Sequence, residues 1–436
     1  MNRPFTSFPV TDFNSFKSQM LSWANQFNIS CFLDNHQYNI APHTYECLLA
    51  VGAKHQLQSK AGNAFQQLVQ FCNIHQDWIF GHFGYDLKNE IEDLSSENVD
   101  GIGFPDLFFF VPEIIIRLEK NTVSISGAID EAKSVMMMIE RTKAVTATRV
   151  ADQGFRIKER FGRKEYMDVI SSLQHHIHRG DCYEINFCQE FYAEDVVIDP
   201  LAVYDQLVRR SPNPFSCYYR LADRFLLCAS PERYLKKTGT KLLSQPIKGT
   251  LKRTSNEGAD ETNRAELFRN LKERTENVMM DDLVRNDLSK VCRQGSVSVS
   301  ELFGIYTFPQ VYQMISSITG EIDEQWHWVD AVRKTFPMGS MTGAPKKKVM
   351  ELIETHERTR RGIFSGAVGY VNPQMDFDFN VVIRSIMYNK EDNYLSYQAG
   401  SGITSFSVPE VEYEECLLKV EAIKKVLTRS AVGQHF

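Results

Sequence analysis

Apolar residues recur with a helical period in several parts of the chain. Between Tyr166 and Ile177 they follow the i, i+3, i+4, i+7 spacing of one helix face, and Gly180 predicts the end of that helix. The next run, YEINFCQEFY, has the composition of a strand. We also expect a long helix over residues 263–290 and a last one from about residue 409 to 427.

Strand-like segments surround these helices. Residues 366–386 and 394–403 read as strands joined by turns, and the first 140 residues mix short strand-like runs, such as FGHFGYDL, with turn signals. Strands and helices do not alternate regularly. The pattern therefore predicts an α+β fold rather than a parallel α/β sheet.

A charged, weakly apolar segment from Glu140 to about Arg160 separates two stretches of stronger pattern. We interpret it as a connector. The predicted organisation is an N-terminal region over residues 1–150 and a larger, catalytic region over residues 151–436.

Composition narrows the class of protein. The chain has 436 residues, of which 43% are hydrophobic and 24% charged, and a net charge of -6, which argues against nucleic-acid binding. We find neither a signal peptide nor an apolar run long enough to cross a membrane, so we predict a soluble cytoplasmic protein. Nine cysteines without a CxxC pair suit a reducing compartment, mostly as core residues. Motifs of P-loop enzymes, zinc proteases and serine hydrolases are absent from the sequence.

Two glutamates occupy unexpected positions on predicted helices. Glu276 shares a helix face with Met280 and Leu283. Glu415 shares an apolar stripe with Val411, Leu418 and Ala422, and Glu412 lies one turn earlier. Acids from distant segments can converge on a hard cation such as Mg²⁺, but the pattern alone fits ordinary salt bridges as well.

Other residues carry weaker signals. Lys248, in SQPIKGT, is either a solvent-facing lysine or, if burial lowers its pKa, a nucleophile. Glu232, in SPER, is uninformative alone. A set of glycines, including Gly343, Gly400 and Gly402, either forms turns or exposes backbone N–H groups to a small anion, which Arg384 could clamp.

Taken in order, these segments resemble one family. The blocks that carry the resemblance are GDCYEINFCQ, SPER, QPIKGT, KERTENVMMDDLVRNDLSKV, TFPMGSMTGAPK, FSGAVGY, VVIRSI, QAGSGI and EYEECLLK. They are similar to the chorismate-utilising enzymes, which include anthranilate, aminodeoxychorismate, isochorismate and salicylate synthases. The resemblance covers residues 161–427 almost completely. It implies a large body of two antiparallel sheets surrounded by helices, with the active site between the sheets.

The resemblance also implies roles for individual residues. Glu276 and Glu415 are expected to hold Mg²⁺ against the ring carboxylate of chorismate, with Glu412 as an auxiliary ligand. Arg384 is expected to bind the enolpyruvyl carboxylate, with backbone donors at Gly400 and Gly402. Thr342 and Gly343 are expected to line the same pocket.

Within the family, anthranilate synthases carry PIAGT, whereas aminodeoxychorismate synthases carry PIKGT, as this chain does with Lys248. The isochorismate and salicylate synthases have a water-activating lysine in the segment that matches YEINF, where this chain has Glu184. The resemblance therefore favours conversion of chorismate and ammonia to 4-amino-4-deoxychorismate, on the route to para-aminobenzoate and folate. Lys248 would attack C2 while Glu232 protonates the departing 4-hydroxyl.

Two positions depart from the family pattern. Glu184 stands where glutamine is usual, and Phe364 stands where a tyrosine is expected to contact substrate. Since the chain has no glutaminase motif, ammonia is expected from a separate glutamine amidotransferase subunit or from ammonium. The alternatives are anthranilate synthase component I, and a catalytically silent chorismate-binding protein.

Overall fold

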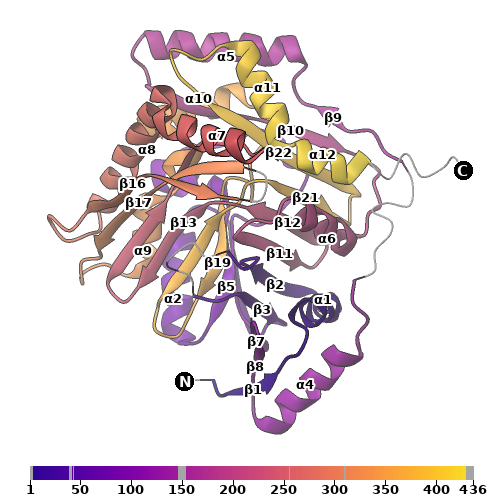
Figure 1. The fold of residues 1–436 in the computed structure, drawn as a ribbon. Helices are drawn as coiled ribbons and strands as arrows, with labels where there is room; N and C mark the ends of the chain where they lie inside the picture. Colours follow the sequence, from indigo (N-terminus) through magenta and orange to yellow (C-terminus); the bar gives the residue numbers. More distant parts are fainter. Residues whose placement is uncertain are drawn as a thin grey trace, which may run out of the picture.

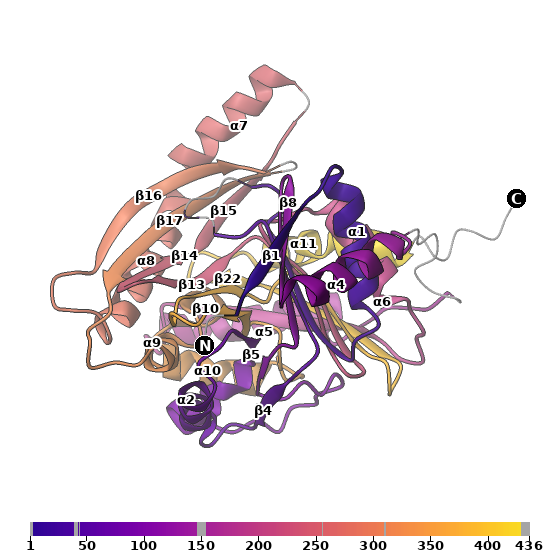
Figure 2. The ribbon, with the colours of Figure 1, turned by 90° about the horizontal axis from the view of Figure 1, so that it is seen from below.

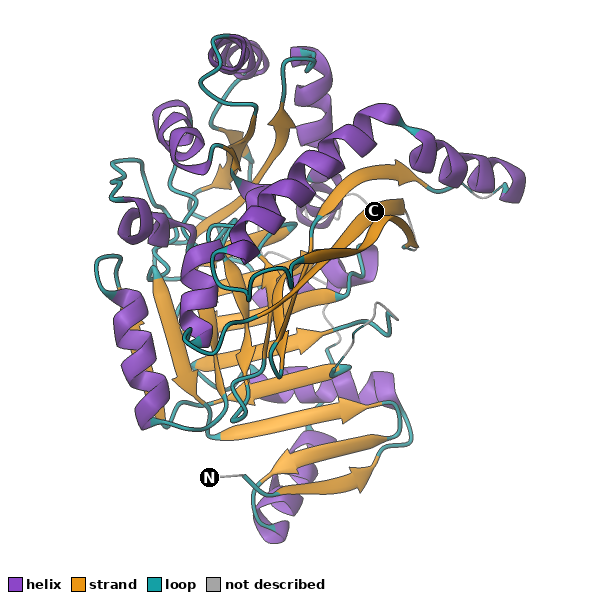
Figure 3. Cartoon of the chain, turned by 90° about the vertical axis from the view of Figure 1, so that its left-hand side faces the viewer, coloured by secondary structure: helices purple, strands orange, loops and turns teal. Residues whose placement is uncertain are grey.

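The structure is a computed structural model that describes residues 3–38, 42, 44–145, 154–254, 256–308 and 311–428. Two antiparallel sheets lie at its centre, and most helices lie around them (Figures 1 and 3). The first sheet has twelve strands, which in order across the sheet are β1 (Phe5–Pro9), β8 (Thr122–Ser126), β7 (Ile114–Glu119), β3 (Cys47–Val51), β2 (Ile29–Asp34), β11 (Phe215–Leu221), β12 (Arg224–Ser230), β21 (Ser385–Asn389), β22 (Tyr394–Ile403), β10 (Glu184–Ala193) and β18 (Gly343–Ala344), with β9 (Lys158–Glu159) paired to β10.

The second sheet has ten strands. In order they are β15 (Ile247–Lys252), β17 (Val311–Glu321), β14 (Lys241–Gln245), β13 (Arg233–Thr238), β20 (Phe377–Val381), β19 (Ala367–Val371), β5 (Ile79–Phe83), β6 (Leu107–Val111) and β4 (His55–Ser59), with β16 (Ser298–Thr307) paired to β17. The helix α7 and strands β15 to β17 stand out at one edge of the molecule (Figure 2).

The α-helices of the described part are α1 (Phe13–Ala24), α2 (Ala64–Ile74), α3 (Lys88–Glu92), α4 (Ile129–Arg141), α5 (Arg163–His178), α6 (Pro200–Arg210), α7 (Glu257–Arg269), α8 (Leu271–Ser289), α9 (Trp328–Thr335), α10 (Lys346–His356), α11 (Pro409–Lys419) and α12 (Glu421–Thr428). Short 3₁₀ helices, η1 (Tyr85–Leu87) and η2 (Gly339–Met341), follow β5 and precede β18. None of the helices in these residues is long and apolar enough to cross a membrane.

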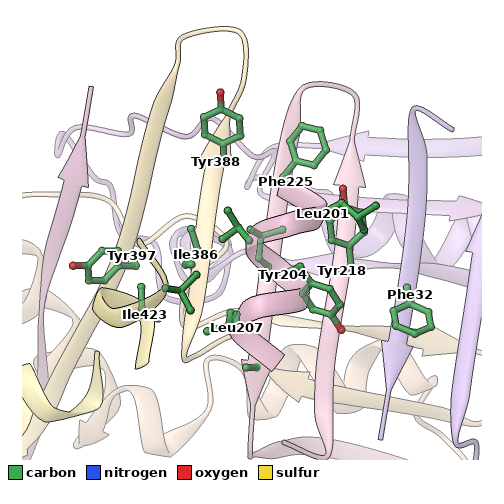
Figure 4. Packing of buried hydrophobic residues seen from close by; sticks show 14 of the residues in the cluster. Phe32, Leu201, Tyr204, Leu207, Tyr218, Phe225, Ile386, Tyr388, Tyr397 and Ile423 are labelled. Carbon is green, nitrogen blue, oxygen red and sulfur yellow. The ribbon is translucent and has the colours of Figure 1, made fainter. Parts of the chain in front are cut away.

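The sheets are buried on both faces. Tyr218 of β11 belongs to the core under the helices, whereas its neighbour Tyr219 belongs to the core between the two sheets. This follows from strand geometry, since successive side chains point to opposite faces. Figure 4 shows the outer core, where Tyr204 and Leu207 of α6 lie over the strands that carry Tyr218 and Ile386.

Most of the predicted helices and strands are present, but two predicted helices are each divided into two shorter ones. The helix expected between Tyr166 and Ile177 is α5, which buries Tyr166, Ile170 and Leu173 as the spacing predicted. The long helix expected over residues 263–290 is two helices that meet at Asn270, whose side chain accepts a hydrogen bond from Glu273 N–H and so caps α8. The last predicted helix is likewise divided, at Val420.

The expected connector is not a simple linker. Its residues Lys158 and Glu159 form β9, which pairs with β10. The predicted boundary at residue 150 lies outside the described residues, so the division into two regions stays a prediction. Strands from before and after it share each sheet.

A buried ion pair, formed by Arg361 and Glu357, joins strand β10 of the first sheet to the short helix η2. Both Arg361 and Glu357 are buried, and the Arg361 guanidinium donates to Glu357 Oε1 at 2.6 Å and Oε2 at 2.9 Å. It also donates to the carbonyl oxygens of Met341, at 2.6 Å, and Asn186, at 2.8 Å. Glu357 in turn accepts from Cys188 N–H of β10. One side chain therefore fixes η2 against β10.

We predict that Arg361→Met lowers the free energy of unfolding by about 3–5 kcal/mol, because it leaves the Glu357 carboxylate buried without a counter-ion. Arg358→Met is the matched control, since Arg358 forms a half-exposed pair with Glu165 that solvent screens, so its loss should cost little. Denaturant unfolding of both variants checks this. Equal losses in the two variants would contradict it.

Candidate active site

The predicted nucleophile lies where the two sheets approach each other. Lys248 belongs to β15 of the second sheet and Glu184 to β10 of the first. Lys248 Nζ donates a hydrogen bond to Glu184 Oε1, with side chains 12% and 3% exposed. This contact brings together two residues that the sequence singled out separately.

The charge state of Lys248 differs from the sequence-based expectation. Burial lowers the pKa of its amine, but the carboxylates of Glu184, Glu276 and Glu415 raise it, and the balance lies above the ordinary lysine value. The expectation that burial yields a free amine is therefore wrong for the protein without substrate. Lys248 is an ammonium held by Glu184.

Glu232 lies in the loop between β12 and β13 and is 4% exposed. Burial raises the pKa of its carboxyl to about 7, against the opposing effects of Ser340, Lys248 and Lys419. Ser340 Oγ donates to Glu232 Oε1 at 2.6 Å. A carboxyl group with this pKa can carry a proton near neutral pH and release it.

Two helices bring further carboxylates to Lys248. Burial, together with Glu184, raises the pKa of Glu276 on α8 to about 7, although Lys248 opposes this shift. Lys419 holds the pKa of Glu415 on α11 below its usual value, and its Nζ lies 2.7 Å from Glu415 Oε1. Both carboxylates act on the pKa of Lys248, so they share its surroundings.

The environment of α11 corrects the predicted stripe. Val411 and Leu418 are 54% and 64% exposed, so Glu415 does not lie among buried apolar residues. The helix instead buries Glu412, Tyr413 and Cys416. Glu412, one turn before Glu415, is 2% exposed.

The three predicted metal ligands do not form a compact cluster. Among the described residues, the group of three acids, cysteines or histidines whose ligand atoms all lie within 4.8 Å of one another consists of Asp34, Glu46 and Cys47. Lys17 forms an ion pair with Asp34 there, at 2.9 Å. Mg²⁺ nevertheless needs only one or two carboxylates beside water and substrate oxygens. Glu276 and Glu415 offer such hard donors.

Arg384 is the residue predicted to bind a carboxylate of the substrate. Its backbone has a φ of 53°, a left-handed conformation that costs energy for a non-glycine residue. Burial lowers the pKa of the guanidinium. Among the described residues it forms no ion pair, and Nη1 donates to Lys419 O at 3.2 Å. A half-buried guanidinium without a carboxylate partner is suited to bind a carboxylate ligand.

The glycines of QAGSGI allow close approach. A Cβ at Gly400 would lie 1.8 Å from Phe187 O of β10. One at Gly402 would lie 2.5 Å from Glu184 Oε1 and 2.8 Å from Lys248 Nζ. Gly343 has a φ of 148°, and a Cβ there would lie 2.0 Å from Glu184 O. Gly402 therefore leaves room for the side chains of Glu184 and Lys248, whereas Gly343 and Gly400 let their strands lie against the backbone of β10.

Two other predicted contacts are less direct. Thr342 is fully buried, and its hydroxyl donates to Met338 O at 3.1 Å. Phe364 is 2% exposed and belongs to the core between the sheets. Their roles toward substrate stay predictions.

Comparison with known proteins identifies the family. Residues 26–425 match the family model described as chorismate binding enzyme. The chain belongs to this family.

Similar proteins of the chorismate-binding family have more than one activity. Aminodeoxychorismate synthase component 1 of Salmonella typhimurium (strain LT2) is 34% identical over 80% of this chain and 76% of its own length. Anthranilate synthase component 1 of Thermus thermophilus is 32% identical over 81% and 78%. The structure of anthranilate synthase component I from Streptococcus pneumoniae has a TM-score of 0.76 at 23% identity, covering 90% of this chain and 94% of that one. The predicted fold is confirmed.

Sequence reasoning assigned no role to Ser340 or Lys419. Both lie inside segments that carried the resemblance to chorismate-binding enzymes, TFPMGSMTGAPK and EYEECLLK. The residues next to Ser340, a glycine and a methionine, do not indicate that its hydroxyl contacts Glu232. The lysine four residues after Glu415 is a recognisable i, i+4 pair and could have been found.

We predict that Gly402→Ala folds but loses activity on chorismate by roughly 100-fold, because the methyl group displaces the ends of two flexible side chains, Glu184 and Lys248. Gly400→Ala instead meets backbone and should lower the melting temperature. Gly162→Ala is the control, since its Cβ meets nothing closer than 3.6 Å. Turnover and thermal unfolding of the three variants check this. Wild-type turnover of Gly402→Ala would contradict it.

Proposed function

We propose that this chain is the synthase component of an aminodeoxychorismate synthase, which converts chorismate and ammonia to 4-amino-4-deoxychorismate. The observation that carries the proposal is the position of Lys248. Its amine lies between the sheets, beside Glu184 and in the electrostatic reach of Glu232. Of the similar relatives, some are named for this activity and others for anthranilate synthesis, so the choice depends on this lysine.

In this proposal the substrate carboxylate binds to a guanidinium that has no carboxylate partner among the described residues. Arg384 takes the enolpyruvyl carboxylate, since its guanidinium has unused donors and burial strengthens an ion pair there. Thr342, Gly343, Gly400 and Gly402 shape the remaining wall. Binding in this orientation places C2 of the ring toward Lys248.

The covalent step begins with a proton transfer. Lys248 gives one proton to Glu184, the carboxylate in contact with it, and keeps the electron pair. The amine then forms a bond to C2, the two ring double bonds shift, and the C4–O bond breaks. Glu232 donates its proton to the departing oxygen, which leaves as water.

The second half reverses the electron flow. Ammonia forms a bond to C4, the double bonds shift back, and the C2–N bond to Lys248 breaks, so the lysine regains its electron pair. The product keeps its enolpyruvyl group. Ammonia comes from a separate glutamine amidotransferase subunit or from ammonium in solution, because no glutaminase motif is present in this sequence.

Glu276 and Glu415, with Glu412 as an auxiliary ligand, are the proposed holders of Mg²⁺. Their hard oxygen donors suit this ion, and a bound cation would oppose the burial and the Glu184 charge that raise the pKa of Glu276. When bound, Mg²⁺ neutralises the ring carboxylate of the substrate.

The test of the function is the product formed from chorismate, Mg²⁺ and ammonium, separated by chromatography. We expect 4-amino-4-deoxychorismate from the wild type and a rate at least about 100-fold lower from Lys248→Ala. Without ammonia, mass spectrometry should detect an adduct on the peptide that contains Lys248. Lys252→Ala, an exposed lysine at the end of the same strand, is the control.

Anthranilate as the product would contradict the proposed activity. Wild-type turnover by Lys248→Ala, together with no adduct, would contradict the nucleophile assignment.

We further predict that Glu276→Ala and Glu415→Ala lose Mg²⁺-dependent turnover while the fold is kept, since each removes a proposed ligand. Glu414→Ala is the control because its exposed carboxylate pairs with Arg163 at the surface. The rate is measured against Mg²⁺ concentration. Full activity of either variant, or of the wild type in excess EDTA, rules out the metal assignment.

A further inference from the structure

The short helix η2 lies directly against the carboxyl group of Glu232. Ser340 Oγ donates to Glu232 Oε1 at 2.6 Å, and the two residues are 5% and 4% exposed. The contact joins residues that are 108 positions apart in the sequence. A buried hydroxyl needs a hydrogen-bond partner, and Glu232 supplies it here.

The turn that carries Ser340 is fixed from three sides. A Cβ at Gly339 would lie 2.8 Å from Leu283 of α8, so this helix packs closely against the turn. Asn186 Nδ2 of β10 donates to Ser340 O at 2.9 Å. Arg361 Nη1 donates to Met341 O at 2.6 Å. The Ser340 hydroxyl therefore has a defined position from which to act on Glu232.

We propose that Ser340 is the positioning residue for the proton donor: it holds Oε1 of Glu232 and so leaves the transferable proton on Oε2. This inference rests on the proposed function. A protonated carboxyl has one oxygen that accepts and one that carries hydrogen. Because the serine donates to Oε1, the acidic hydrogen resides on Oε2. Rotation of the carboxyl group that exchanges the two oxygens would replace the accepting Oε1 beside Ser340 with the protonated Oε2, which is a weaker acceptor.

The same contact assists proton release. When Glu232 gives up its proton, the hydrogen bond from Ser340 becomes charge-assisted and stronger. Ser340 therefore stabilises the carboxylate and lowers the pKa of Glu232, as do Lys248 from β15 and Lys419 from α11. Burial acts in the opposite direction and is the largest effect. Without the hydroxyl, the pKa of Glu232 rises further.

The experiment is the pH profile of kcat/KM for Ser340→Ala, measured with chorismate, Mg²⁺ and ammonium. Activity needs protonated Glu232, so it falls as pH rises through the pKa of about 7. In the variant this fall should move to higher pH by about one unit, and the maximal rate should drop about 10-fold.

Ser365→Ala is the matched control. Ser365 is fully buried and its hydroxyl contacts Met341 Sδ at 3.4 Å, so it touches the same turn without reaching Glu232. Its pH profile should stay at the wild-type position. If Ser340→Ala does not fold, Ser340→Cys, which keeps the size but donates weakly, replaces it and should shift the profile in the same direction.

A lower rate of the Ser340 variant with an unmoved pH profile overturns the inference, because a merely structural role gives that result. The Glu232→Gln variant distinguishes a failure of the role of Ser340 from a failure of the proposed function. If it is inactive while Ser340→Ala keeps the wild-type profile, only the role of Ser340 fails. If Glu232→Gln keeps wild-type turnover, the proton donor of the proposed function fails.

Discussion

A guanidinium that is shielded from water has to find acceptors for its N–H groups inside the protein, and Arg361 finds them on both sides of the active site. It binds Glu357 with two hydrogen bonds and the carbonyl oxygens of Asn186 and Met341 with two more. Its planar group also lies over the ring of Tyr85, 4.6 Å from the ring centre. The cost of burying the ion pair is offset only in this geometry. Strand β10 and the turn η2 are therefore held in one arrangement.

This arrangement also fixes the positions of residues in the candidate active site. Strand β10 carries Glu184, and η2 carries Ser340, so the partners of Lys248 and of Glu232 are both attached to elements that Arg361 fixes. Neither partner depends on a long loop. This explains how Lys248 of the second sheet and Glu232, in the loop that joins the two sheets, keep defined contacts with their partners.

Opposing environments give the two groups different proton states. Lys248 and Glu232 are both buried, and burial disfavours charge on each. Around Lys248 several carboxylates outweigh burial, and the amine stays protonated. Around Glu232 burial outweighs one hydroxyl and two lysines, and its pKa rises to about 7. The site thus holds the proposed acid, Glu232, in place, and the proposed nucleophile, Lys248, still has to lose a proton, for which Glu184 is the adjacent acceptor.

The sequence by itself determined the local elements and the family. Apolar spacing predicted α5 because helix periodicity is a property of consecutive residues, and ordered blocks such as QPIKGT carried the resemblance without any coordinates. The buried face of α11, the ammonium state of Lys248 and the contact between Ser340 and Glu232 were decided only by the tertiary structure. Lys248 meets a partner 64 positions away and Ser340 one 108 positions away. Burial and charge act through space, so residues that lie far apart along the chain set each pKa and each hydrogen bond of the site.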